Sequence, residues 1–165
     1  MFDLKPLHPD AIPAALEKAM RYRLLNEPGE AESICLDVLA VEPDNQRALV
    51  TLLLAMTDRF GKGYAVSATR VREIAGRLRD DYERCYYAGI VAERNGKFQL
   101  QQGAPGSSFA AFDLLREAME FYEQAEKIRP PSNDDALLRW NACARLIMGN
   151  RLKPRTVEPY EPALE

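Results

Sequence analysis

The sequence is poor in the residues that build catalytic and metal sites. It has a single histidine, His8, and three cysteines that lie far apart, at Cys35, Cys85 and Cys143. This wide spacing excludes a CxxC metal or redox pair. Each cysteine falls on an apolar helical stripe, so we interpret all three as small hydrophobic core residues. We predict no catalytic residue, no metal site and no cofactor.

Long apolar runs and a large excess of charge of one sign are also missing. The most apolar run, residues 48–56, has nine residues, whereas a transmembrane helix needs roughly 20. The net charge is −3, but a protein that binds phosphate backbones usually carries a basic face. The first residues include Asp3 and Pro6, which do not fit a secretory signal. We therefore expect a cytoplasmic protein that binds neither nucleic acid nor membrane.

Amphipathic helical segments fill most of the chain. With 165 residues, 47% hydrophobic and 28% charged, the chain is long enough for one domain with a core. In one segment Ala118, Phe121, Tyr122 and Ala125 recur at the spacing of one helix face, and Pro130 ends the helix. Similar segments, separated by proline or glycine breaks, predict an all-α fold. The expected helices lie near residues 9–26, 30–41, 45–59, 65–79, 81–95, 108–129 and 134–148.

The helix that ends at Pro130 has a counterpart earlier in the chain. Ala31 precedes Pro43 by the same twelve residues that separate Ala118 from Pro130. In both segments the alanine begins an apolar stripe and the proline closes the helix. Two copies of one helix-to-proline unit indicate a repeat protein.

A third unit contains Gly89 and Gly96, seven residues apart on a stripe of small side chains. We attribute Gly89 to close contact with a neighbouring helix. With these features the chain resembles the tetratricopeptide repeat family, whose units of roughly 34 residues are antiparallel helix pairs stacked into a superhelix. The resemblance implies a right-handed superhelix of about three repeats and a C-terminal capping helix. The first repeat departs from the family in lacking its signature tryptophan, and the second lacks the closing proline.

This resemblance also divides the chain into parts. The third repeat carries an insertion near residues 97–113, in which we expect a loop over 99–108 and Ser108 as the N-cap of the next helix. The predicted parts are a leader (1–11), a helical repeat domain (12–149) with repeats at 12–45, 46–81 and 82–132 and a capping helix at 133–149, and a Pro-rich extended tail (150–165).

Stacked helix pairs leave one curved inner surface, which is lined by the first helix of each pair. The family resemblance implies that the stripe beside the packing face points into this groove. Apolar side chains flanked by arginine favour a peptide or helix with a hydrophobic face as the ligand. The predicted partner-binding groove consists of Leu16, Met20, Arg23, Arg47, Val50, Leu54, Tyr86, Ile90, Arg94, Asn141 and Arg145.

These features favour a protein-interaction module that acts as a scaffold or adaptor for a protein or peptide partner. We do not expect an enzyme. Two alternatives stay open. One is a small-ligand or enzymatic groove around Tyr86, Arg94 and Arg145. The other is a mainly self-associating structural protein, such as a homodimer. The insertion or the tail would also be able to cover the groove, and we expect the tail to pack on the repeats or on a neighbouring molecule through Tyr160 or Leu164.

Overall fold

The structure is a computed structural model that describes residues 2–62 and 66–156. These residues form helices and connecting turns without a strand, so the expected all-α fold is confirmed for them. None of these helices is long and apolar enough to cross a bilayer. After a 3-10 turn (Pro9–Ala11), the helices are α1 (Ile12–Leu24), α2 (Pro28–Val41), α3 (Gln46–Asp58), α4 (Ala68–Gly76), α5 (Asp81–Gln102), α6 (Ser107–Lys127) and α7 (Asp135–Gly149).

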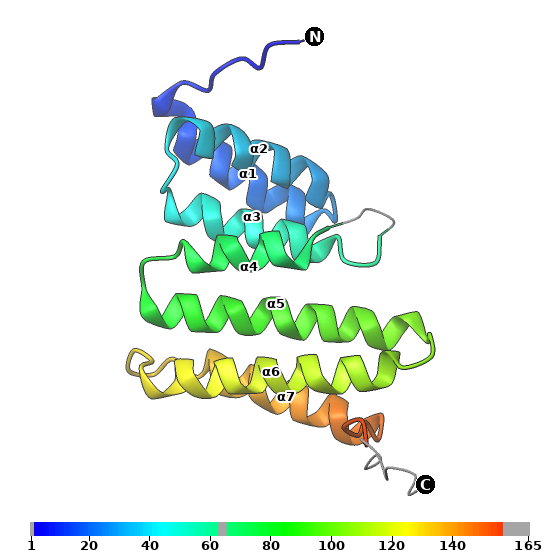
Figure 1. The fold of residues 1–165 in the computed structure, drawn as a ribbon. Helices are drawn as coiled ribbons and strands as arrows, with labels where there is room; N and C mark the ends of the chain where they lie inside the picture. Colours follow the sequence, from blue (N-terminus) through cyan, green and yellow to red (C-terminus); the bar gives the residue numbers. More distant parts are fainter. Residues whose placement is uncertain (1, 63–65, 157–165) are drawn as a thin grey trace, which may run out of the picture.

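The helices lie beside one another in a single stack (Figure 1). Each helix packs against the next one along the chain, and α3 also contacts α1 and α5. The longest contact is between α5 and α6, which form an antiparallel hairpin in the lower half of Figure 1. Helices α1, α3 and α5 are therefore neighbours on one side of the stack, although other helices separate them in the sequence.

Side-chain caps fix where three of the helices begin. Asn45 Oδ1 accepts a 2.9 Å hydrogen bond from the backbone N–H of Ala48, at the start of α3. Asp80 Oδ1 accepts one of 2.8 Å from Glu83 at the start of α5, and Ser67 caps α4 in the same way. Each cap satisfies one of the backbone donors that have no partner in the first turn.

Two glycines allow α5 and α6 to pack closely. A Cβ atom added to Gly89 would lie 2.5 Å from the ring of Tyr122, and one added to Gly96 would lie 3.1 Å from Leu115. The first distance is too short for any side chain without movement of the tyrosine. The explanation of Gly89 by helix contact is therefore confirmed.

Two large apolar clusters form the core. One is built from residues of helices α1 to α5, and the other from residues of helices α5 to α7. Cys35 is fully buried in the first cluster and Cys143 in the second. Burial raises the pKa of each thiol to about 12. The interpretation of these two cysteines as core residues is confirmed, whereas Cys85 is only half-buried.

The insertion differs from the prediction because most of it is helical. Helix α5 continues to Gln102, so the loop expected over 99–108 shrinks to residues 103–106. Gly103 and Gly106 have φ angles of +61° and +81°, a region that glycine enters without steric cost. The turn is therefore tight, and α6 starts at once with Gly106 as its N-cap. The prediction of Ser108 as N-cap is wrong, because Ser108 already lies inside the helix.

Two other helices are shorter than predicted. The segment expected to be helical over 9–26 starts with the 3-10 turn, and α1 ends at Leu24, just before Asn26 takes a φ of +61°. Of the segment expected over 65–79, the described residues 66–79 are helical from Ala68 to Gly76. Glycine costs about 1 kcal/mol relative to alanine inside a helix, which makes Gly76 a natural place for α4 to end.

The described part of the tail, residues 150–156, runs from the end of α7 to the turn between α5 and α6. Leu152 packs on the cluster between α5 and α7, and the Arg155 guanidinium lies 5.7 Å from the centre of the Phe109 ring. The predicted packing of Tyr160 or Leu164 concerns residues that lie outside the described part of the chain.

Candidate functional site

An apolar pocket of about 490 Å³ lies where α1, α3 and α5 meet. Four residues of the predicted groove, Met20, Arg47, Val50 and Leu54, line it together. Side chains of α1 and α3 that lie up to 34 positions apart in the sequence therefore meet at one pocket. The full lining is Met20, Gln46, Arg47, Val50, Thr51, Leu54, Glu83 and Tyr87.

Three polar side chains of this apolar pocket, Thr51, Glu83 and Tyr87, show the effect of their surroundings. The Thr51 hydroxyl is buried and donates a 2.8 Å hydrogen bond to the backbone oxygen of Arg47, one turn earlier in α3. Burial, with the negative charge of Glu83, raises the pKa of Tyr87 to about 12, so its phenol stays protonated near neutral pH. Burial, with Asp80, also raises the pKa of Glu83. The pocket therefore offers apolar surface, a phenolic donor and one charge of each sign.

A polar pocket of about 330 Å³ follows one helical turn further along α3. It is bounded by the end of α3, the second half of α5 and one side chain of α7. The polar pocket is lined by Thr57, Asp58, Phe60, Arg94, Lys97, Phe98, Gln101 and Arg139.

Asp58 joins three helices at one edge of the polar pocket. Its carboxylate accepts hydrogen bonds of 2.8 Å from Arg23 Nε of α1 and 2.6 Å from Arg94 Nη1 of α5. Arg94 also donates to the Leu54 backbone oxygen at 3.1 Å and to the Thr57 hydroxyl at 2.5 Å. Burial lowers the pKa of Arg94, while the Asp58 charge acts in the opposite direction. These two arginines of the predicted groove therefore hold the helices together.

Glu93 pairs with two of the side chains that line the polar pocket, Lys97 and Arg139. Its side chain is fully buried, and its Oε2 accepts a 2.6 Å hydrogen bond from the Tyr122 hydroxyl of α6. Its Oε1 pairs with both Lys97 of α5 and Arg139 of α7. Burial lowers the pKa of Arg139, but Glu93 and a hydrogen bond with Tyr86 outweigh this effect and raise it.

Positive charge exceeds negative charge around the polar pocket. Lys97 and Arg139 both form ion pairs with the same oxygen of Glu93, Oε1, and each side chain remains 37% exposed. With Arg23 and Arg94 there are four cations against the two carboxylates of Asp58 and Glu93. The local balance is therefore +2.

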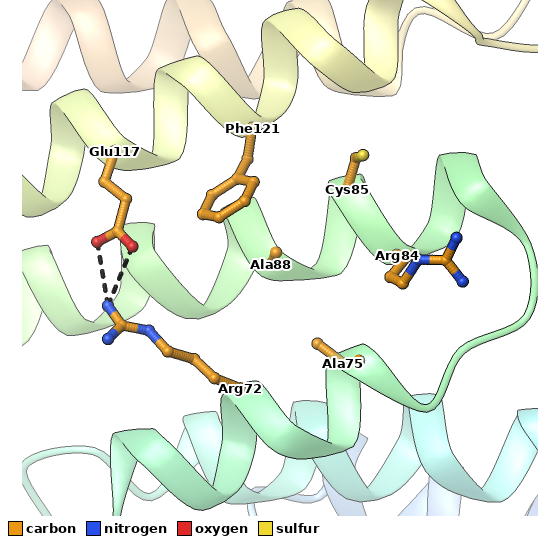
Figure 2. Close-up of a pocket in the computed structure, with 8 residues that line it drawn as sticks. Arg72, Ala75, Arg84, Cys85, Ala88, Glu117 and Phe121 are labelled. Carbon is orange, nitrogen blue, oxygen red and sulfur yellow. Dashed lines mark hydrogen bonds and ion pairs between the residues drawn. The ribbon is translucent and has the colours of Figure 1, made fainter.

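A further pocket of about 380 Å³ lies between α4, α5 and α6 (Figure 2). Its apolar wall includes Cys85, Ala88 and Phe121, and Arg72 of α4 pairs with Glu117 of α6 across one end at 3.0 Å. None of the residues in the predicted groove lines this pocket. In the sequence this pocket is indicated only weakly, by the stripe of small side chains in α5.

Two residues of the predicted groove are in the core, which corrects the prediction. Leu16 is 3% exposed and packs in a cluster with Val38 and Ala48, and Ile90 is 2% exposed between α5 and α7. Each lies on a helix that has neighbours on two sides, so two adjacent apolar stripes are buried instead of one.

The remaining groove residues lie outside the two pockets. Tyr86 is half-buried, with its ring centre 5.7 Å from that of Tyr82 and 6.0 Å from that of Tyr122. Asn141 is half-buried and Arg145 is exposed, both on α7. In residues 2–62 and 66–156 no group of three or more His, Cys, Asp or Glu side chains is placed to hold a metal ion.

The family resemblance found in the sequence gains no independent support from known proteins. Comparisons with protein-family models, with curated proteins and with solved structures found no match to this chain.

Proposed function

We propose that this chain is a protein-interaction module that binds a peptide or helix through the apolar pocket of α1, α3 and α5. In this proposal the helix pairs form a right-handed superhelix of the tetratricopeptide type, and the protein acts in the cytoplasm as a scaffold or adaptor. The observation that carries the proposal is the meeting of Met20, Arg47, Val50 and Leu54 in one pocket.

The size and chemistry of the apolar pocket support a protein ligand. About 490 Å³ is within the range of roughly 300–1,000 Å³ typical of binding pockets, and it has room for one or two large apolar side chains. Arg47 and Glu83 lie among the apolar lining residues. Interfaces commonly combine a buried apolar centre with polar groups that fix the orientation of the partner.

The alternative of an enzymatic or small-ligand groove around Tyr86, Arg94 and Arg145 has less support. Arg94 already bonds to Asp58, Thr57 and the Leu54 backbone. Tyr86 packs against other tyrosine rings. These two side chains stabilise the fold, and Arg145 lies apart from the pockets. A self-associating protein stays an alternative, which the mass of the protein in solution would test.

The test is affinity capture from a lysate of the source organism with matched charge-changing variants. Arg47→Glu with Val50→Asp alters the apolar pocket. Arg70→Glu with Thr69→Asp makes the same changes of charge on exposed positions of α4. Circular dichroism would verify that both variants keep the helical content of the wild type.

We expect the wild type and the α4 variant to enrich the same proteins, and the pocket variant to lose them. The single variant Arg47→Glu, at an exposed position, should show a partial loss. Equal enrichment by all variants, or no enrichment by the wild type, would contradict the proposed function.

A further inference from the structure

Two cations of the polar pocket keep part of their hydrogen-bonding capacity unused. An ammonium group has three donors and a guanidinium five. In the described part of the chain Lys97 donates to Glu93 alone, and Arg139 bonds to Glu93 and Tyr86. Because both side chains line the pocket and remain partly exposed, their remaining donors are available to a ligand that enters it.

These cations are already held in place without a ligand. Glu93 is fully buried and bonded to the Tyr122 hydroxyl at 2.6 Å, and it pairs with the ends of both Lys97 and Arg139. Arg94 is held in turn by Asp58, at 2.6 Å. Side chains that are ordered before binding lose less entropy when a ligand binds, so the polar pocket is preorganised for an anion.

The size of the charge excess indicates which anion fits. The four cations exceed the two carboxylates by two charges. A phosphomonoester carries a charge of about −1.5 to −2 near neutral pH and has three strong acceptor oxygens. A single carboxylate would balance only half of the excess. The polar pocket therefore matches a phosphoryl group in both charge and number of acceptors.

Two phenylalanine rings line the same pocket and suit an aromatic carrier for this group. Phe60 and Phe98 are both half-buried. Phe60 packs on the apolar cluster of helices α1 to α5, and the Phe98 ring lies 2.9 Å from a Cβ built on Gly61. Offset or edge-to-face contacts between aromatic rings are favourable. A volume of about 330 Å³ is at the lower end of the range for ligand pockets, which suits one ring with one phosphoryl group.

We propose that the polar pocket binds a phosphomonoester carried on an aromatic ring. The phosphoryl oxygens accept hydrogen bonds from Lys97 and Arg139, and the ring packs against Phe60 and Phe98. Small aryl phosphates and the phosphotyrosine side chain of a protein share this chemistry. The inference does not rest on the proposed function, because no residue lines both the polar and the apolar pocket.

Titration of the isotope-labelled protein with phenyl phosphate, followed by NMR, tests the binding. At about pH 8, above the second phosphate pKa near 6, we expect saturable shifts at residues of the polar pocket. Phenyl sulfate has the same shape and one negative charge less, so it should bind about ten-fold more weakly, since hydrogen bonds to ions gain strength from charge. Inorganic phosphate, which lacks the ring, should also bind several-fold more weakly.

A charge series at Gln101 tests the location. Gln101 lines the polar pocket at an exposed position near the end of α5. Gln101→Glu should weaken the binding of phenyl phosphate several-fold, and Gln101→Lys should strengthen it. Gln102 is also exposed but lies outside the lining, so Gln102→Glu and Gln102→Lys should stay close to the wild type. Glutamate and lysine are good helix formers, and circular dichroism would verify the fold of all four variants.

Three results would overturn the inference. The first is the absence of saturable shifts with phenyl phosphate. The second is equal affinity for phenyl phosphate and phenyl sulfate, or for phenyl phosphate and inorganic phosphate. The third is an equal effect of the same charge change at Gln101 and Gln102, which would show attraction by the surface as a whole.

A peptide with one phosphotyrosine distinguishes the two sources of the ligand. Tighter binding of this peptide than of phenyl phosphate would identify a protein ligand, and equal or weaker binding would identify a small molecule. The unphosphorylated peptide should not bind in either case.

The variant Arg47→Glu, Val50→Asp separates this inference from the proposed function. It should bind phenyl phosphate about as tightly as the Arg70→Glu, Thr69→Asp variant does. If phenyl phosphate binds but the variant of the apolar pocket captures the same proteins as the wild type, this inference stands and the proposed function fails. If capture depends on the apolar pocket but phenyl phosphate does not bind, the proposed function stands and this inference fails.

Discussion

The hydroxyl of Tyr122 donates a 2.6 Å hydrogen bond to the carboxylate of Glu93, and both side chains are fully buried. A buried carboxylate is tolerated only when its oxygens are paired. Here the second oxygen pairs with Lys97 and Arg139. Since these partners come from α5, α6 and α7, the glutamate couples the packing of the last three helices to the charge of the polar pocket.

The first prediction concerns this pair. Tyr122→Phe removes the hydroxyl but keeps the ring, so one oxygen of Glu93 loses its partner. The free energy of unfolding should fall by about 1–3 kcal/mol, the usual cost of an unsatisfied buried polar group. Urea unfolding followed by circular dichroism measures it. A change below about 0.5 kcal/mol, the scale of ordinary surface substitutions, would show that the hydrogen bond adds nothing.

The second prediction concerns Gly89. Gly89→Ala places a methyl group 2.5 Å from the Tyr122 ring, so the free energy of unfolding should fall by about 1–3 kcal/mol, as in other overpacked cores. Gly29→Ala is the matched control, because nothing lies within 4 Å of its added Cβ, and alanine favours the helix there. Thermal unfolding compares the two. Equal melting temperatures would contradict the close approach of α5 and α6.

The third prediction concerns alkaline pH. In the unfolded chain Cys35 and Cys143 have their ordinary pKa of 9.0, but burial raises it to about 12 in the folded protein. Below pH 9 both states keep the proton. Between pH 9 and 12 only the unfolded state loses it, so stability falls as the pH rises, by at most about 1.4 kcal/mol per pH unit for each thiol.

Urea midpoints measured from pH 8 to pH 11 test this dependence. The variant Cys35→Ala, Cys143→Ala should be less stable at pH 8 and lose less stability above it. Parallel pH profiles for wild type and variant would rule out a contribution from the thiols.

The fourth prediction concerns thiol reactivity. Cys85 lines the pocket between α4, α5 and α6, while the other two cysteines are fully buried. A thiol reagent should therefore modify one cysteine in the folded protein and three in denaturant. Cys85→Ala should remove the fast reaction. Rapid modification of all three thiols without denaturant would contradict the burial of Cys35 and Cys143 in the core.

Most of the helices were predictable because helix periodicity and proline or glycine breaks are local signals. The residue at which α5 ends was not predictable from these local signals. The glycines of residues 103–106 were read as part of a longer loop, but Gln99 and Gln102 are good helix formers, and α5 and α6 pack against each other over their length. Pairing with α6 therefore decides the length of α5, and it is not visible in the local sequence.

The pocket was predictable only in part. Val50 and Leu54 of the predicted groove line the apolar pocket, whereas Leu16 and Ile90 are covered by neighbouring helices. Periodicity shows that a stripe is apolar and does not show how many neighbours the helix has. The burial of Glu93 was not predictable for the same reason, since a buried acid depends on partners from other helices.

Photo-cross-linking at two positions would show whether the apolar pocket binds a protein partner. A benzophenone amino acid would replace Arg47 at the apolar pocket or, as the control, Arg70 on α4, both of them exposed. After irradiation in cells of the source organism, we expect covalent protein adducts of defined mass at position 47 and none at position 70. Adducts of equal yield at both positions, or none at position 47, would contradict the claim that the face of α1, α3 and α5 binds a protein partner.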